Sequence, residues 1–246
     1  MDKRILKVLI TGGSRGLGRI MVEYLYKQGH EVYIFSNTAK TEIDPSYISI
    51  LAGYTECDLS KANEIGECFG KLIKNTERID VLINNAAVRQ FNRKLDEFQI
   101  SEIPENINVD FVAPVILSKL CLQVMKRFNF GRIINISSIG AYKVFSTGSL
   151  YCSSKSALIA FSESLSKELI SLRGTITVNT ICLDSISKMD GTKLKIHRRI
   201  TDSVLAKIDS IIQSESNGMV MNEFTFKHKL RESLRLIKRA VQMLIS

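Results

Sequence analysis

Short apolar runs alternate with longer amphipathic segments through most of this chain, a pattern that predicts strands and helices in turn. The runs that predict buried strands are Ile5–Ile10, Glu31–Ser36, Gly53–Leu59, Ile79–Ala87, Gly131–Ser138 and Thr175–Leu183. The segments that predict helices are Gly18–Gly29, Lys61–Thr76, about Glu105–Phe128 (containing Pro114) and Ser149–Leu172. Strands that are apolar throughout and separated by helices are typical of a parallel sheet covered on both faces. The pattern therefore predicts a doubly wound α/β fold.

Length and composition fit that fold. The chain has 246 residues, of which 45% are hydrophobic and 24% are charged. We expect one domain over residues 1–246, since no domain boundary is evident before Cys182. The first apolar run is short and interrupted by Lys7, so it predicts a strand and not a signal peptide. No stretch approaches the roughly 20 apolar residues of a membrane span.

The cysteines indicate the cellular compartment of the protein, and the net charge indicates its possible partners. The five cysteines are scattered along the chain, at Cys57, Cys68, Cys121, Cys152 and Cys182. Their odd number and the lack of a C-x-x-C pair predict reduced thiols, a cytoplasmic protein and no metal site. The net charge of +9 fits nucleic acid, an anionic membrane or a solvated surface that attracts anionic cofactors. Because the cations are mostly dispersed, we favour the solvated surface and expect no nucleic-acid partner.

The first strand runs into the glycine-rich turn "TGGSRGLG", Thr11–Gly18, which opens a helix. Glycines there let the backbone approach a pyrophosphate, and the helix N-terminus supplies N–H groups and positive potential. A plain tight turn is the alternative. The order of strand, turn and helix favours a dinucleotide site.

The stretch "SLYCSSKSAL" places Tyr151 and Lys155 four residues apart in a predicted helix, so both lie on one face. An ammonium beside a phenol favours the phenolate form, which makes the phenol a usable acid/base near neutral pH. The alternative is a helix-face pair with only a small effect on stability. The pair by itself leaves both open.

Taken together, these motifs resemble the short-chain dehydrogenase/reductase (SDR) family over about residues 4–186. The chain resembles the family's T-G-x-x-x-G-x-G, post-strand D-L, N-N-A-G, helix asparagine, catalytic serine, Y-x-x-x-K and sixth-strand patterns. The matching residues are Thr11, Gly12, Gly16 and Gly18; Asp58–Leu59; Asn84–Ala87; Asn108; Ser138; Tyr151 and Lys155; and "TVNTI" at Thr177–Ile181. The resemblance implies a Rossmann-like fold and a nicotinamide-dependent oxidoreductase that interconverts a ketone and a secondary alcohol.

The resemblance also implies roles for single residues. Tyr151 would be the acid/base, Lys155 would also hold the nicotinamide ribose, and Ser138 would hydrogen-bond the substrate oxygen. Asn108 would anchor a water that links Lys155 to solvent. The residues that would contact the cofactor are Gly12, Ser14, Arg15, Gly16, Gly18, Asn37, Asp58, Leu59, Asn85, Tyr151, Lys155 and Ile186.

The segment after the second strand bears on which nicotinamide is bound. NAD usually pairs its ribose 2′-hydroxyl with an acid there, but this chain has small polar residues at Ser36–Thr38 and no acid before Glu42. Arg15 in the glycine-rich turn could hold a 2′-phosphate through its guanidinium. We therefore expect NADP(H) more than NAD(H), although Arg15 could be an ordinary exposed turn residue.

Two segments depart from the family pattern. Leu183–Asp184 replaces the usual P-G, and Lys188 falls near the position of a threonine that helps seat the nicotinamide. Asp184 could place an acid beside the cofactor or cap the next turn. The family's closing strand has no counterpart in the C-terminal tail, so we expect six strands, or a seventh taken from a segment such as Met221–Phe226.

The tail itself reads as an amphipathic helix, packed on its own sheet or forming a partner surface. Its apolar positions are Leu230, Leu234, Ile237, Val241 and Leu244. Residues 187–222 would form the substrate lid, and the cations of Lys193–Arg199 would suit an anionic substrate or simply lie on a solvated helix face.

Two functions and one assembly follow as expectations. The first function is the oxidoreductase; the second is a cofactor-binding protein with little or no turnover, acting as a sensor or assembly partner, which the altered Leu183–Asp184 segment would favour. The two long helices, at about Glu105–Phe128 and Ser149–Leu172, carry more apolar residues than one sheet face needs. We expect them to pair with their copies in a homodimer.

Overall fold

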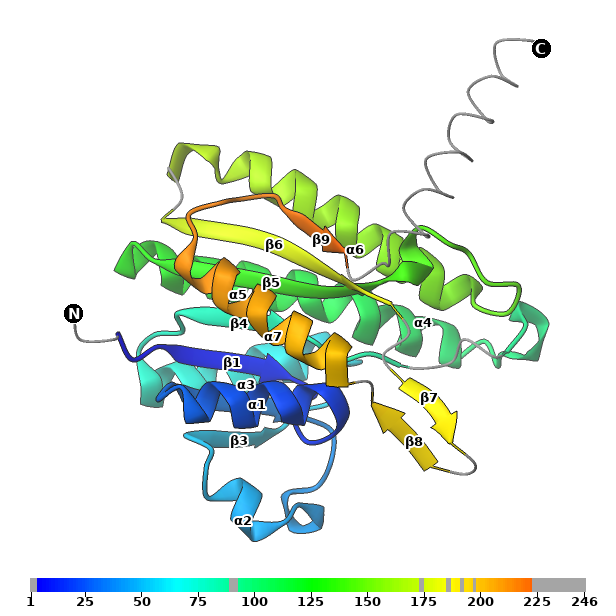
Figure 1. The fold of residues 1–246 in the computed structure, drawn as a ribbon, viewed down its shortest axis with the longest axis horizontal. Coiled ribbons are helices and arrows are strands. Elements are labelled where there is room, and N and C mark those ends of the chain that lie inside the picture. Colours follow the sequence, from blue (N-terminus) through cyan, green and yellow to red (C-terminus); the bar gives the residue numbers. More distant parts are fainter. Residues whose placement is uncertain are drawn as a thin grey trace.

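The computed structural model describes residues 4–88, 93–172, 175–184, 187–190, 193–196 and 198–222. Within them one parallel sheet has the strand order β3-β2-β1-β4-β5-β6-β9 (Figure 1). Its strands are β1 (Lys7–Thr11), β2 (Glu31–Ser36), β3 (Gly53–Glu56), β4 (Val81–Asn84), β5 (Gly131–Ser138), β6 (Ile176–Leu183) and β9 (Val220–Asn222). Ile186 and the predicted C-terminal helix lie outside the described residues.

The helices connect these strands, and a separate hairpin follows β6. The α-helices are α1 (Gly16–Lys27), α2 (Pro45–Ile48), α3 (Ala62–Thr76), α4 (Glu102–Ile107), α5 (Ala113–Phe128), α6 (Ser149–Glu168) and α7 (Arg198–Gln213). Short 3-10 helices lie at Lys40–Glu42, Leu95–Glu97, Ile139–Ala141 and Ile170–Leu172. The hairpin pairs β7 (Ser187–Asp190) with β8 (Lys193–Ile196) in antiparallel fashion. The hairpin and α7 occupy the predicted lid region.

Helices cover both faces of the sheet. In Figure 1, α1 and α7 lie in front of it, and α3, α5 and α6 lie behind. Alternate residues of each strand point to opposite faces of the sheet and pack in two apolar layers. On β1, Val8 and Ile10 pack toward α1 and α7, and Leu9 packs toward α3 and α5. The predicted doubly wound fold is confirmed. The strand order reverses between β1 and β4, and ligands of such sheets bind in the crevice at the carboxyl ends on either side of that point.

The expectation of six strands is wrong, because β9 adds a seventh at the edge beside β6. It overlaps the segment that we named as a possible substitute. With only three residues, β9 shows no recognisable strand pattern in the sequence. Asparagine side chains hold the strand in place. Asn179 accepts from Met219 N at 2.8 Å, while Asn217 accepts from Val178 N at 2.9 Å and donates to Ser166 O at 2.8 Å.

The long helix predicted over Glu105–Phe128 is present as α4 and α5, joined by a π-helical turn at Asn108–Val112. Pro114 explains the wider turn, since a proline ring clashes with the carbonyl four residues earlier in a regular α-helix. By length and hydropathy the continuous segment Glu102–Phe128 could cross a membrane. The core helices of soluble proteins also meet that criterion, and here Leu117 and Cys121 are buried in the core beneath the sheet.

A row of polar side chains crosses the core between the sheet and helices α5 and α6. Asn84 on β4 donates to Asn135 Oδ1 on β5 at 2.7 Å, and Asn135 donates to Ser162 Oγ on α6 at 2.8 Å. Ser118 on α5 approaches Asn84 Nδ2 at 3.5 Å. Asn84 Oδ1 has no hydrogen-bond partner among the described residues. Both asparagines are almost fully buried, so this row is an internal feature of the core.

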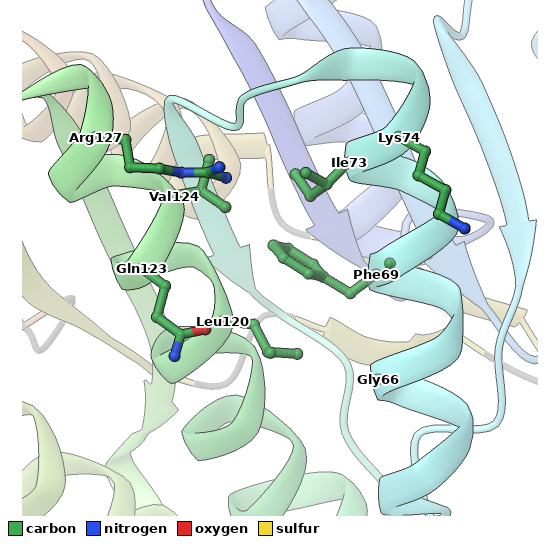
Figure 2. Close-up of a pocket in the computed structure, with 9 residues that line it drawn as sticks. Gly66, Phe69, Ile73, Lys74, Leu120, Gln123, Val124 and Arg127 are labelled. Atoms are coloured by element: carbon green, nitrogen blue, oxygen red, sulfur yellow. The ribbon is translucent and has the colours of Figure 1, made fainter.

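A surface groove of about 560 Å³ runs between α3 and α5. Figure 2 shows the Phe69 ring pointing from α3 into the groove and Leu120 approaching it from α5. Gly66 and Gly70 lie one helical turn apart on α3, and a Cβ at either would meet nothing within 4 Å. The groove is hollow in part because these two positions lack side chains.

We expect Gly70→Ala to raise the free energy of unfolding by about 0.5–1 kcal/mol, because alanine restricts the unfolded chain and has room in the helix. Urea denaturation measures the change. Gly131→Ala is the control and should destabilise, since its Cβ would lie 2.3 Å from Met125 Sδ. A loss of stability in Gly70→Ala would mean that the groove is filled in solution.

Candidate active site

The carboxyl end of β5 and the start of α6 are held together by hydrogen bonds. Ser137 Oγ donates to Lys155 O at 3.0 Å, and Ser156 Oγ donates to Ala141 O at 3.0 Å. Ser138, the last residue of β5, accepts from Gly140 N at 3.1 Å through its Oγ. These bonds place the predicted serine beside the first turns of the helix that carries the predicted tyrosine and lysine.

Tyr151 and Lys155 lie together on α6, as the spacing predicts. The Lys155 Nζ is 5.8 Å from the centre of the Tyr151 ring. Lys155 is only 3% exposed, and its ammonium donates to Ile136 O at 3.4 Å. A Cβ added to Gly140 would lie 3.2 Å from Tyr151 Cε1, so the tyrosine ring packs against the turn that follows Ser138. The structure thus brings the serine, tyrosine and lysine to one corner at the carboxyl end of β5.

The glycine-rich turn is fastened to the end of β4. Thr11 Oγ1 accepts from Asn85 N at 2.9 Å and from Ala86 N at 3.0 Å. The Asn85 side chain donates to Thr11 O at 2.9 Å and to Gly12 O at 3.2 Å. Gly12 has a left-handed backbone (φ +66), and its missing Cβ would lie 3.0 Å from Ala86 Cα. Asn85 therefore shapes the turn on which a cofactor would rest.

The N-terminus of α1 fits an anion. Arg15, Gly16 and Gly18 lie where the turn becomes helix, and the first turn of α1 has no acidic residue. The side chain of Arg15, the N-cap residue, makes no capping hydrogen bond, which suits amide groups that would meet a pyrophosphate. Together with the close glycine packing, this end of α1 fits a dinucleotide phosphate.

A hydroxyl cluster lies at the end of β2, where an acid would favour NAD. Ser36 Oγ donates to Ser14 Oγ at 3.0 Å, and Ser14 Oγ is 3.2 Å from Thr38 Oγ1. Asn37, between Ser36 and Thr38, is exposed. Arg15, which follows Ser14 in the glycine-rich turn, is also exposed. The segment that follows β2 therefore carries neutral polar groups where NAD-binding sheets usually carry an acid.

The sequence reasoning missed Tyr47, which supports the glycine-rich turn from behind. Tyr47 is buried, donates from its hydroxyl to Gly13 O at 2.6 Å, and stacks under the Arg19 guanidinium at 4.4 Å. Burial raises the pKa of the Tyr47 phenol, so it stays a neutral donor. Asp44, which caps α2, and Pro45 were the only signals for this helix.

The segment after β3 carries two of the predicted cofactor contacts, Asp58 and Leu59. Asp58 accepts from the hydroxyl of Ser60 at 2.7 Å and pairs with Lys61 at 3.0 Å, and these bonds lower its pKa. Leu59 is buried. Asn108 also reaches this segment, because its amide donates to Ser60 O at 2.8 Å. The Asn108 side chain thus ties the π-turn to the loop after β3.

Among the described residues, one group of potential metal ligands lies between the segment after β3 and helix α3. Cys57, Glu64 and Cys68 bring their ligand atoms within 4.8 Å of one another. Burial raises the pKa of the Cys57 thiol, which disfavours the thiolate that binds metals. Glu64 also accepts from Asp58 N at 2.7 Å. We interpret this group as core packing.

The departure from the family pattern lies beside the predicted serine. Leu183 is paired with Ser138 across β6 and β5, and the half-buried Asp184 follows it directly. Ile186, the last predicted cofactor contact, lies outside the described residues. The altered segment is therefore adjacent to the corner that holds Tyr151.

Comparisons with known proteins agree with this architecture. The model of the short chain dehydrogenase family matches residues 6–195. The chain is 31% identical over 174 residues to carbonyl reductase family member 4 of Xenopus tropicalis, covering 70% of this chain and 72% of that protein. It is 31% identical over 202 residues to the 3-oxoacyl-[acyl-carrier-protein] reductase FabG of Rickettsia prowazekii, covering 81% and 80%.

Solved structures share the fold at low identity. A 4-hydroxyisoleucine dehydrogenase complexed with NADH and succinate superposes with a TM-score of 0.73 at 22% identity, covering 87% of this chain and 96% of its own. A metagenomic short-chain oxidoreductase in complex with NADP superposes with a TM-score of 0.74 at 23% identity, covering 89% and 96%. These proteins bind one nicotinamide cofactor or the other.

Proposed function

The chain belongs to the short-chain dehydrogenase/reductase family of NAD(P)-dependent oxidoreductases, and on this premise we propose that it interconverts a ketone and a secondary alcohol with Tyr151 as acid/base. The observation that carries the proposal is the corner at the end of β5. There Tyr151 packs against the turn after Ser138, and the buried Lys155 lies on the same helix face. The glycine-rich turn and the end of β4 meet at the same edge of the sheet.

Each group has a defined task in this proposal. A nicotinamide, when bound, supplies or accepts the hydride. The Ser138 hydroxyl donates to the substrate oxygen and fixes its orientation, and the Tyr151 hydroxyl gives a proton to that oxygen in the direction of reduction. Lys155, which is buried, places a positive charge near the ring on which the phenolate forms. In the direction of oxidation the same phenolate takes the proton back.

The direct test uses the purified full chain with a panel of carbonyl substrates. We expect NADPH consumption with at least one ketone, and cofactor binding in a separate fluorescence titration. Binding without turnover on any substrate would instead support the second function, a cofactor-binding sensor or assembly partner. The replacement of P-G by Leu183–Asp184 beside Ser138 is the observation that favours this alternative.

We propose NADP(H) as the preferred cofactor. The Ser14, Ser36 and Thr38 hydroxyls cluster at the end of β2, and the segment from Ser36 to Thr38 contains no acidic residue. Arg15 is exposed at the N-terminus of α1, where its guanidinium could meet a 2′-phosphate in bidentate fashion.

We expect Arg15→Ala to weaken NADPH binding about tenfold or more while changing NADH binding little, because only NADPH carries the extra phosphate. Fluorescence titrations with both cofactors measure the two dissociation constants. Arg127→Ala, which removes an exposed cation on α5, should change neither. Equal losses for NADPH and NADH would show that Arg15 does not discriminate between them.

An anionic carbonyl substrate fits the charge around the proposed lid. The β7–β8 hairpin follows β6 at the carboxyl end of the sheet (Figure 1). Lys193 and Lys195 belong to β8, and Arg198 and Arg199 begin α7 with exposed side chains. Anions would be drawn to this edge of the molecule.

A cytoplasmic location is proposed from the thiols. All five cysteines are free and buried. Proteins of reducing compartments keep their thiols in this form.

We propose a homodimer built on the outer faces of α5 and α6. Ile116 and Leu120 on α5 and Phe161 on α6 are only partly buried in one chain, so a second copy could cover them in an isologous contact.

Light scattering at micromolar concentration should give twice the monomer mass. Leu120→Glu should shift the mass toward the monomer, whereas Lys207→Glu on α7 should not. A stable monomer of the unmodified chain would contradict this assembly.

A further inference from the structure

The π-turn between α4 and α5 buries an acidic residue that the roles above do not use. Asp110 is 2% exposed, and its carboxylate accepts from Val88 N at 2.7 Å. Val88 directly follows the Asn84–Ala87 segment, which holds the glycine-rich turn through Thr11. One oxygen of Asp110 therefore anchors the strand end on which the cofactor turn rests.

The position of Asp110 follows from the sequence around it. In a regular α-helix the ring of Pro114 would clash with the carbonyl of Asp110, four residues earlier. The backbone instead widens into a π-turn, in which Ala113 N donates to Asn108 O. Such turns are frequent at functional sites.

A buried carboxylate requires compensation for its lost hydration. Burial raises the pKa of Asp110, and the positive charge of Lys155 acts in the opposite direction. Lys155 is itself buried, on the helix that carries Tyr151. Two buried side chains of opposite charge therefore lie on elements that pack against each other, the π-turn and α6.

No other charged side chain of the helices packed against the π-turn competes for this role within the described residues. Glu102 on α4 pairs with Arg93 at 2.8 Å. Apart from Lys155, the remaining charged residues on α4, α5 and α6 are exposed: Glu105, Lys119, Lys126, Arg127, Glu163, Lys167 and Glu168. Lys155 is thus the only buried cation on these three helices.

We propose that Asp110 is a positioning residue of the active site, which anchors the turn after β4 through Val88 and supplies the buried counter-charge for Lys155. The proposal rests on the proposed function, because it assigns Asp110 to the Tyr151–Lys155 pair. It makes the acid–base behaviour of that pair depend on a carboxylate outside the four residues of the family pattern.

The sign of the effect follows from electrostatics. Removing a negative charge makes nearby acids lose their protons at lower pH, since the neutral phenol and the ammonium each lose the charge that favoured the protonated form. Asp110→Asn removes the charge and keeps an oxygen that can accept from Val88 N. Asp110→Ala removes both the charge and the acceptor.

We expect the pH–rate profile of Asp110→Asn to move to lower pH by about half a unit or more, with NADPH affinity within about threefold of the unmodified chain. Asp110→Ala should show the same shift and bind NADPH about tenfold more weakly, because the turn after β4 is released. Glu105→Gln, which neutralises an exposed acid on α4, should change neither quantity. Asp110→Ser provides a second charge-free variant if the asparagine variant does not fold.

A readout without turnover separates this proposal from the proposed function. Ultraviolet difference spectra follow tyrosinate formation, and subtracting the spectra of matched Tyr151→Phe proteins isolates Tyr151. A lower midpoint for Tyr151 ionisation in Asp110→Asn would support the counter-charge even if no substrate were turned over. Unchanged midpoints in both the asparagine and serine variants, or full NADPH affinity in Asp110→Ala, would overturn the proposal.

Discussion

Replacing Tyr151 with phenylalanine is expected to lower turnover by about a hundredfold or more while leaving cofactor binding intact. The substitution removes the phenol proton that the proposed mechanism transfers to the substrate oxygen. It keeps the aromatic ring, which packs against Gly140, so the helix should hold its place. Steady-state kinetics on the best carbonyl substrate gives the turnover, and fluorescence titration gives the NADPH dissociation constant.

The split between the two measurements is the informative result. Loss of binding and turnover together would indicate a folding defect, which a thermal melt would reveal. Tyr26→Phe is the matched control, because Tyr26 is an exposed tyrosine on α1 and its variant should resemble the unmodified chain in both assays. Turnover near the unmodified level in Tyr151→Phe would remove Tyr151 from the acid/base role.

Gly18→Ala is expected to abolish measurable cofactor binding and to destabilise the fold. Its Cβ would lie 2.1 Å from Gly12 O and 2.7 Å from Asn85 Nδ2. Neither atom belongs to a side chain free to swing away, because Gly12 O is backbone and Asn85 fastens the turn to β4. Relief requires the turn and α1 to separate, at a cost of about 1–3 kcal/mol.

The measurements for this variant are NADPH titration and urea denaturation. Gly70→Ala is the matched control, since the same substitution on α3 meets open space. Affinity within about twofold of the unmodified chain in Gly18→Ala would show that the turn tolerates the added methyl group.

Much of this arrangement could be predicted from the sequence, because local patterns determine it. Six strands were predicted from apolar runs in the sequence. The close spacing of Tyr151 and Lys155 predicted a shared helix face, which the structure confirms. The glycine-rich turn was recognisable because only glycine fits where Gly18 crosses Gly12. The family itself is confirmed by the match over residues 6–195.

The rest depends on contacts between segments far apart in the chain. Tyr47 carries no local signal for its bond to Gly13, which joins residues 34 positions apart. β9 is too short to show a period, and its place depends on Asn179 and Asn217. Asp110 is recognisable in the sequence as a single acid in an apolar helical stretch. Its hydrogen bond to Val88, however, depends on tertiary packing.

The buried row of Asn84 and Asn135 has a consequence for how the chain avoids misfolding. These residues are paired across β4 and β5, with their amides on the side of α5 and α6. Slipping either strand by one position would turn its amide toward the apolar layer under α1 and α7, among residues such as Ile83 and Ile134. A buried amide without a hydrogen-bond partner there costs about 1–3 kcal/mol. Each sheet with a shifted strand is therefore destabilised relative to the native sheet. The row thereby widens the energy gap between the native sheet and its shifted competitors.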